Sequence, residues 1–313
     1  MNYRPFGGTD LKLSEVGFGA WAMGGRSFGA VPEAEALDAL ARAEELGCNF
    51  IDSAAVYGNA EEILGRFLST RRDRWIVASK YSGQKEGMRK TLESQLSSLG
   101  THYLDFYQVH WMPGPGEEHL LPELLALKDE GKVRYVGVSI YTSEEVRRAL
   151  AHPDLDGFQL KISLLSPSPF LELREEIARA GKGLLARSAL EDGFLTGKYG
   201  EDARFRDPDD RRSAFRPRQL QGLARRAAEF SRLGGEGLPL LLLATRYVLA
   251  FPEVSSLLLS TKNRAQADTN FGAVPREGLP QGKLQEIEAL QGRLGLREAR
   301  SLPGRILRRL RNL

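Results

Sequence analysis

Short apolar runs alternate along the chain with longer stretches in which apolar residues recur every three or four positions. Short runs bounded by turn residues predict buried strands, and the periodic stretches predict amphipathic helices. The predicted strands are Glu15–Gly19, Phe50–Asp52, Trp75–Ser79, Phe106–His110, Tyr135–Ser139, Gly157–Leu160, Gly183–Arg187 and Ser255–Leu259. The predicted helices are Pro32–Leu46 and the segments at about 60–69, 86–99, 120–130, 143–151, 170–180 and 238–250.

This order of elements predicts the fold class. Strands that alternate with helices favour a parallel sheet of the α/β class. Eight such units in 313 residues fit a (β/α)8 TIM barrel. A doubly wound open sheet stays an alternative, because counting strands does not exclude it. The sequence shows no interdomain linker, so residues 1–313 are predicted to form one domain.

Three segments lie outside the alternation. Tyr3–Phe6 and Leu11–Leu13 flank a Gly-Gly-Thr-Asp turn, which predicts an N-terminal β-hairpin. Gly197–Gln221 is long, charged and poor in aliphatic residues, and a loop of this length is usually a functional lid or disordered. Lys283–Leu313 predicts one or two extra C-terminal helices.

Composition excludes several classes of partner. Apolar residues make up 42% of the chain and the net charge is only +3, which gives no argument for nucleic acid. Cys48 is the single cysteine, so no intrachain disulfide can form and a reducing compartment is expected. The most apolar segment, Leu238–Phe251, is too short to span a bilayer. The four histidines show no metal-ligand spacing. We therefore expect a cytoplasmic protein without a membrane, nucleic-acid or metal partner; the oligomeric state is left open.

Ionisable side chains end three consecutive predicted strands: Asp52, Lys80 and His110. In a (β/α)8 barrel the carboxyl ends of the strands converge on the face that carries the chemistry. Each residue alone has a structural explanation, but three in succession, with Tyr57 one short loop beyond Asp52, indicate a site. The later predicted strands also end on or near polar residues, namely Ser139, Gln159, Arg187 and Ser260.

These four residue types suit proton transfer to a carbonyl. A free tyrosine has a pKa of about 10, and a nearby ammonium group lowers it by stabilising the phenolate. Lys80 is expected to have this effect on Tyr57, with Asp52 offsetting the cost of burying the lysine. His110 could then hydrogen-bond the substrate oxygen, which suits protonation of a carbonyl during hydride addition. None of these groups can supply hydride, so a nicotinamide cofactor is required.

Several long motifs, in order, resemble the aldo-keto reductase family between about residue 3 and about residue 272. They are Gly47–Gly65, Ser79-Lys80, Ser98–Trp111, Gly131–Ser139 and Gly193–Lys198. The resemblance implies a (β/α)8 barrel and NADPH-linked reduction of an aldehyde or ketone. It places the catalytic tetrad on Asp52, Tyr57, Lys80 and His110, with Tyr57 as the acid. Trp21 and Trp111 are expected to line the substrate pocket with Tyr57 and His110.

The resemblance also implies a nicotinamide site. Ser139 and Gln159 match the positions that hold the carboxamide. The family usually has asparagine after this serine, where this chain has Ile140. The family's Tyr-Ser-Pro-Leu appears here as Arg187-Ser188-Ala189-Leu190, so Arg187 replaces the aromatic residue that stacks on the nicotinamide. A guanidinium can also stack on a ring, and its charge should favour the reduced cofactor.

A second set resembles the family's clamp for the adenosine phosphate, and it favours NADPH over NADH. Lys262 and Arg264 are cations at the start of a predicted helix, where phosphate is attracted. The complete expected cofactor set is Gly19, Trp21, Ser139, Gln159, Arg187, Ser188, Leu190, Gly193, Lys198, Ser260, Thr261, Lys262, Arg264, Gln266 and Asn270.

Two other functions stay open. A barrel that binds NADPH for regulation, without catalysis, would be consistent with Ile140 and Arg187. A barrel enzyme that forms a Schiff base on Lys80 is a weaker alternative. The substrate is not identified, and its specificity is expected to lie in the loops Trp21–Val31, Trp111–Glu118 and Gly197–Gln221 and in the C-terminal tail.

Overall fold

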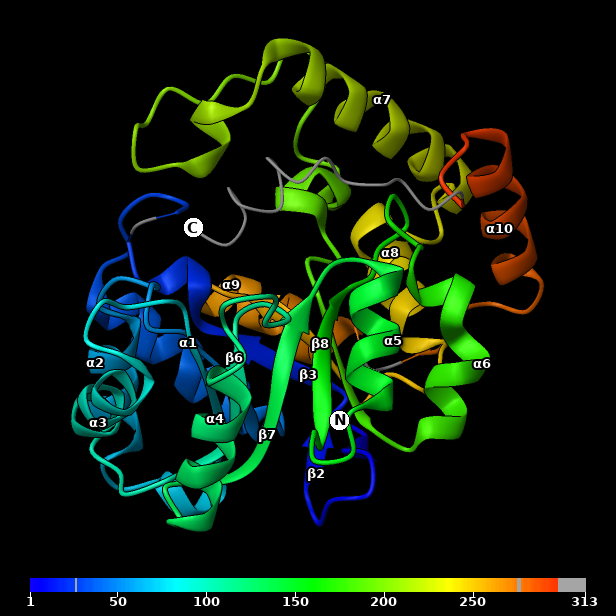
Figure 1. Cartoon of the computed structure of the whole chain (residues 1–313). Coiled ribbons are helices and arrows are strands. Elements are labelled where there is room, and N and C mark those ends of the chain that lie inside the picture. The colour runs from blue at the N-terminus through cyan, green and yellow to red at the C-terminus, as the bar shows by residue number, and fades with distance from the viewer. Residues whose placement is uncertain (26, 275–276, 298–313) are drawn as a thin grey trace.

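Eight parallel strands close into a barrel in this computed structural model, which describes residues 1–25, 27–274 and 277–297. The strand order around the barrel is β10-β3-β4-β5-β6-β7-β8-β9 (Figure 1). The strands are β3 (Val16–Gly19), β4 (Phe50–Asp52), β5 (Ile76–Tyr81), β6 (Leu104–Val109), β7 (Val133–Ile140), β8 (Gly157–Lys161), β9 (Gly183–Arg187) and β10 (Ser256–Ser260). The predicted (β/α)8 barrel is confirmed, and the closed sheet excludes the open-sheet alternative.

Helices surround the barrel and pack one apolar face against it. Ala36, Leu40 and Ala43 of α1, three or four positions apart, are fully buried. Local signals set the ends of several helices: Thr142 and Glu145 form a capping box at the start of α5, and Gly100 ends α3 with a φ of 62°. These helices are α1 (Glu33–Glu45), α2 (Ala60–Leu68), α3 (Met88–Leu99), α4 (Leu120–Asp129), α5 (Ser143–Ala151), α6 (Phe170–Ala180), α8 (Leu240–Leu249) and the short α9 (Arg264–Ala267).

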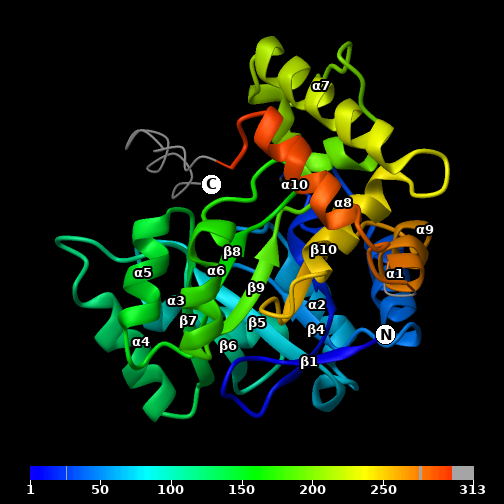
Figure 2. The ribbon, with the colours of Figure 1, turned by 90° about the vertical axis from the view of Figure 1, so that its right-hand side faces the viewer.

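The predicted hairpin, β1 (Tyr3–Pro5) with β2 (Lys12–Ser14), lies at the end of the barrel where the strands begin (Figures 1 and 2). Phe6 directly follows β1 within the hairpin, and its ring is buried against the first residues of β8 and β9. Both are glycines, and a Cβ would lie 2.4 Å from the Phe6 ring at Gly157 and 2.3 Å from it at Gly183. These two glycines therefore make room for the ring, and the hairpin closes this end of the barrel.

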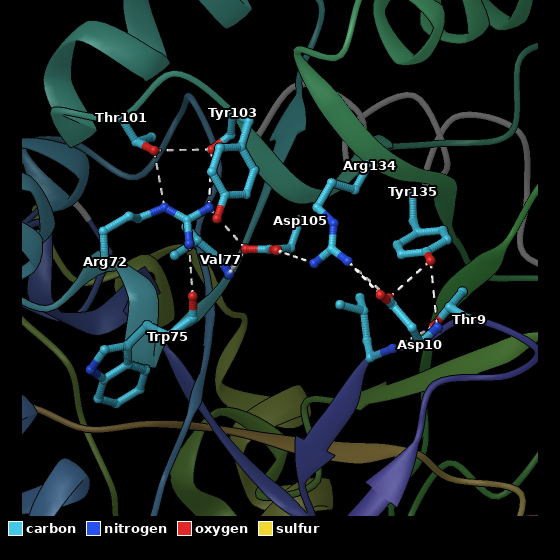
Figure 3. Close-up of polar contacts among 11 residues, drawn as sticks. Thr9, Asp10, Arg72, Trp75, Val77, Thr101, Tyr103, Asp105, Arg134 and Tyr135 are labelled. Atoms are coloured by element: carbon cyan, nitrogen blue, oxygen red, sulfur yellow. Dashed lines mark hydrogen bonds and ion pairs between the residues drawn. The ribbon is translucent and has the colours of Figure 1, made fainter.

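A buried carboxylate ties the same end together (Figure 3). Asp105 of β6 is 3% exposed and accepts hydrogen bonds from Arg72, from Arg134 and from the backbone N–H of Val77, each at 2.9 Å. Arg134 also pairs with Asp10 of the hairpin turn, with a shortest distance of 2.7 Å. Three donors thus satisfy the buried charge and link it to the hairpin.

The structure corrects the prediction over the second half of the chain. The long helix α7 (Pro217–Gly234) was not predicted, and residues 217–221, expected to be loop, form its first turn. Together with α10 (Lys283–Arg293), α7 lies above the carboxyl ends of the strands (Figures 1 and 2). Of the one or two C-terminal helices expected from the sequence, α10 is the first, and residues 298–313 of that segment lie outside the described residues. The assignment of residues 1–313 to one domain stays a prediction.

Two further findings concern classes of partner. No helix in the described part of the chain is long and apolar enough to cross a membrane. The described residues also contain no cluster of histidine, cysteine and acidic side chains that could hold a metal ion.

Candidate active site

A buried ion pair lies at the floor of the candidate site. Asp52 is the last residue of β4, and Lys80 lies on the neighbouring strand β5. The Lys80 side chain is 0% exposed, and its Nζ donates to Asp52 Oδ2 and to the backbone oxygen of Ser53, both at 2.6 Å. Burial lowers the pKa of Lys80, and the charge of Asp52 opposes this shift. Gln159 of β8 donates to the other Asp52 oxygen at 3.0 Å, so the carboxylate is held from two sides.

Tyr57 lies against this pair, in the loop between β4 and α2. Its ring centroid is 5.2 Å from Lys80 Nζ and 5.8 Å from the Trp21 ring, on which it stacks. Burial, followed by the charge of Asp52, raises the pKa of Tyr57 well above 10. This corrects the expectation that Lys80 lowers it. The ammonium faces the ring and is engaged by Asp52 and Ser53, so burial dominates and Tyr57 is a neutral phenol.

His110 directly follows β6, and its ring centroid is 6.4 Å from that of Tyr57. Burial and the charges of Lys80 and Arg187 hold the pKa of His110 well below 6.5, so the imidazole is neutral. Its Nδ1 lies 2.8 Å from Ser82 Oγ. If the Ser82 hydroxyl donates, the proton of the neutral ring is on Nε2. Ser82 was not foreseen, because a serine two residues after Lys80 belongs to no pattern in the sequence.

A cavity of about 1180 Å³ at the carboxyl ends of the strands brings most of the predicted site residues together. Its lining includes Gly19, Trp21, Asp52, Tyr57, His110, Gln159, Arg187, Ser188, Leu190, Gly193, Lys198, Ser260, Lys262, Gln266 and Asn270. The sequence did not indicate that Leu223 and Arg226 of α7 also line this cavity.

Five predicted residues do not line the cavity. Lys80, Ser139 and Thr261 are fully buried. Trp111 packs on Tyr81 with 6.0 Å between ring centroids, and its indole N–H donates to Glu117. Arg264 is directed toward α1, where it pairs with Asp38 at 2.8 Å and with Glu45 at 3.3 Å.

Lys262 and its neighbours occupy the turn after β10. The Lys262 ammonium donates to the backbone oxygen of Phe28, and its backbone N–H donates to Gln266 Oε1 at 2.9 Å. Asn270 donates to Thr261 Oγ1, also at 2.9 Å. Gln266 and Asn270 therefore hold this turn in place.

Ser139 Oγ and Arg187 Nε are among the buried polar atoms near the strand ends that have no hydrogen-bond partner among the described residues. Ser139 of β7 lies opposite Gln159 of β8 in the strand register. Arg187, the last residue of β9, donates from Nη2 to the oxygen of Ile140 at 3.2 Å, and its guanidinium lies 4.3 Å from the centroid of the Tyr141 ring.

The charged segment after β9 packs against the loop after β3 above the cavity. Phe28 pairs with Asp210 through the backbone, and the Arg211 N–H donates to the Ser27 oxygen at 2.9 Å. The Arg211 guanidinium lies 4.6 Å from the Trp21 ring. Of the two alternatives for this segment, a lid or disorder, its packing over the cavity favours a lid.

Comparisons with known proteins give a consistent result. Residues 15–291 match the model of the Aldo/keto reductase family. The chain is 28% identical to an L-galactose dehydrogenase of Arabidopsis thaliana, over 93% of this chain and 94% of that protein. It is 30% identical to an NADH-specific methylglyoxal reductase of Escherichia coli, over 64% of this chain and 71% of that protein. A solved structure, the glycerol dehydrogenase AKR11B4 from Gluconobacter oxydans, is 26% identical with a TM-score of 0.78, over 96% of this chain and 98% of that one.

Proposed function

The chain belongs to the aldo/keto reductase family, and we propose that it is an NADPH-dependent oxidoreductase that reduces an aldehyde or a ketone to the alcohol. Members of this family are oxidoreductases that act on carbonyls and alcohols with a nicotinamide cofactor. One observation carries the proposal: the neutral, half-buried phenol of Tyr57 lies beside His110 and the Asp52–Lys80 ion pair, in a cavity large enough for a cofactor and a small substrate.

The side chains have distinct tasks in this proposal. NADPH, when bound, would supply the hydride. Tyr57 donates its proton to the carbonyl oxygen, and a high pKa keeps that proton available at neutral pH. Asp52 holds Lys80 against the Tyr57 ring, where its charge offsets part of the cost of the phenolate that remains. His110, neutral and fixed by Ser82, donates a hydrogen bond to the same oxygen and orients the substrate, which Trp21 contacts from the side.

The residues at the strand ends fit a nicotinamide. The Gln159 amide lines the cavity and offers an acceptor for a carboxamide, and the unpartnered Ser139 hydroxyl lies beside it in the strand register, just behind the cavity wall. Ser188, Leu190, Gly193 and Lys198 line the same cavity and would hold the diphosphate. For the 2′-phosphate, Lys262 is the favoured cation because it lines the cavity. Arg264 would first have to leave Asp38 and Glu45.

The experiment that tests this function has two steps. Fluorescence titration of the purified protein with NADPH and, in parallel, with NADH measures both affinities. Oxidation of NADPH is then followed with a panel of aldehydes and ketones. Tight NADPH binding with carbonyl-dependent oxidation supports the proposal. Binding of neither cofactor, or binding without turnover of any carbonyl, contradicts it.

A non-catalytic barrel that binds NADPH for regulation is the second candidate. It is favoured by Ile140 and Arg187, which replace residues that usually contact the nicotinamide. Oxidation of bound NADPH in a single turnover by a reactive aldehyde separates the two functions. The Schiff-base alternative is disfavoured, because Lys80 Nζ is fully buried, paired with Asp52 and absent from the cavity lining. A cytoplasmic location stays a prediction from the single cysteine.

A further inference from the structure

Arg187 is a cation in the cavity wall that no carboxylate in the described part of the chain neutralises. Its guanidinium contacts the Ile140 oxygen and the Tyr141 ring. Among the described residues its Nε has no partner and no acid lies within ion-pair distance of it. Three other cations of the wall each have an acid. Lys161 pairs with Glu191 at 2.7 Å, Arg212 with Asp210 at 2.5 Å, and Arg211 with Asp192 at 3.5 Å.

The charge of Arg187 reaches the reacting groups. Burial dominates the pKa shifts of Tyr57, Lys80 and His110, but Arg187 contributes to all three in the direction that favours loss of a proton. A guanidinium stays protonated in proteins, so this charge is permanent. The contacts to Ile140 and Tyr141 also fix its position.

We propose that Arg187 makes the site bind the reduced nicotinamide cofactor in preference to the oxidised one, and so favours carbonyl reduction over alcohol oxidation. This rests on the proposed function. In the overall reaction the carbonyl, NADPH and one proton give the alcohol and NADP⁺. The nicotinamide gives up a hydride, which carries two electrons, and its ring becomes positively charged. A fixed, unneutralised cation at the same end of the barrel raises the free energy of the oxidised form and leaves the neutral form nearly unaffected.

The position of Arg187 favours this role over binding of an acidic substrate group. Its guanidinium lies over the end of β7, where it contacts Ile140 and Tyr141. Ser139 and Gln159, the pair that suits a carboxamide, lie near the carboxyl ends of β7 and β8. Tyr57 and His110 approach the cavity from β4 and β6. Arg187 therefore lies on the side of the cavity where the nicotinamide ring is expected.

The test measures the dissociation constants of NADPH and NADP⁺ separately, by fluorescence titration and calorimetry. Wild type is compared with Arg187→Gln and Arg187→Met, which remove the charge, and with Arg187→Lys, which keeps it. Arg147→Gln, the same change on the exposed face of α5, is the control for net charge. We expect the ratio Kd(NADP⁺)/Kd(NADPH) to fall about tenfold in the two neutral variants. A tenfold change corresponds to about 30 mV for this two-electron couple. Arg187→Lys should keep most of the wild-type ratio, and Arg147→Gln should keep all of it.

Thermal unfolding and circular dichroism identify a variant that does not fold, and the other neutral variant then carries the test. A ratio unchanged in a folded neutral variant overturns the proposal. It is also overturned if the ratio is unchanged while the variant loses a wild-type preference for acidic over neutral carbonyls, which would assign Arg187 to the substrate. Binding of neither cofactor form by wild type overturns the proposed function as well.

Discussion

The hydroxyl oxygen of Ser82 lies 2.8 Å from Nδ1 of His110, so a residue outside the predicted tetrad fixes the ring expected to orient the substrate. Ser82→Ala removes this hydrogen bond, and we expect kcat/KM to fall about tenfold, the effect of one lost hydrogen bond. Affinity for NADPH should be unchanged, because Ser82 is absent from the cavity lining. Ser82→Thr keeps the hydroxyl and should keep most of the activity. An alanine variant with wild-type kinetics would show that Ser82 does not set the tautomer of His110.

Tyr57→Phe tests the proton donor directly. The change removes the hydroxyl and keeps a ring to stack on Trp21. Because a general acid contributes roughly 10²–10⁴-fold to a rate, turnover should drop by about that factor. The dissociation constant of NADPH should stay nearly unchanged. Unaltered turnover in this variant would remove Tyr57 from the mechanism.

His110 predicts a pH dependence of stability. Its pKa in the folded protein lies well below 6.5, so the unfolded chain binds more protons as the pH falls through that value. The unfolding free energy therefore rises with pH. The part of it that comes from keeping His110 neutral is complete above about pH 6.5 and is lost as the pH falls below that value. The slope from one such group is at most about 1.4 kcal/mol per pH unit. Urea unfolding of wild type and His110→Gln between about pH 5 and pH 7 checks this. Curves of equal slope for the two proteins would contradict it.

Lys262 and Arg264 form a matched pair for cofactor choice. Lys262→Met should weaken NADPH binding by about tenfold or more, the effect of losing a charged hydrogen bond, with little effect on NADH. Arg264→Met should change neither affinity much, since this side chain already pairs with Asp38. Fluorescence titration of both variants with NADPH and with NADH measures these affinities. The reverse result would assign the 2′-phosphate to Arg264.

Asp105 predicts a stability effect that is separate from the site (Figure 3). Asp105→Ala removes the buried carboxylate that accepts from Arg72, Arg134 and the Val77 N–H, and we expect the unfolding free energy to fall by about 2–3 kcal/mol. Asp10→Ala breaks the exposed ion pair with Arg134 and should cost less than about 1 kcal/mol. Denaturant titration measures both. Equal losses of unfolding free energy in the two variants would show that the buried carboxylate of Asp105 stabilises the protein no more than the exposed one of Asp10.

The sequence predicted the barrel well because each strand is a separate short apolar run, as in Trp75–Ser79, whose structural counterpart is Ile76–Tyr81. It failed at α7, where the buried face is made of Leu220, two alanines and Phe230 among many arginines and glutamines. The buried residues follow helical spacing, but the charged residues at the start of the segment favoured a loop in the prediction.

The candidate active site was also predicted only in part. Residue types at strand ends predicted that Asp52, Lys80 and His110 would meet, because a parallel barrel brings such ends together. The direction of the Tyr57 pKa shift could not be predicted, since it depends on how deeply the ring is buried and on which part of it faces Lys80. The direction of Arg264 likewise depends on Asp38 and Glu45, more than 200 positions away in the sequence.

The packing of the Phe6 ring against two glycines also has a consequence for folding during synthesis. The hairpin is synthesised before the barrel strands, yet the glycines that accept the Phe6 ring lie at positions 157 and 183, and Leu258 joins the same small apolar cluster. The apolar residues of the hairpin therefore remain exposed until β8, β9 and β10 have been made. Closure of the barrel and burial of the Phe6 ring must then occur together.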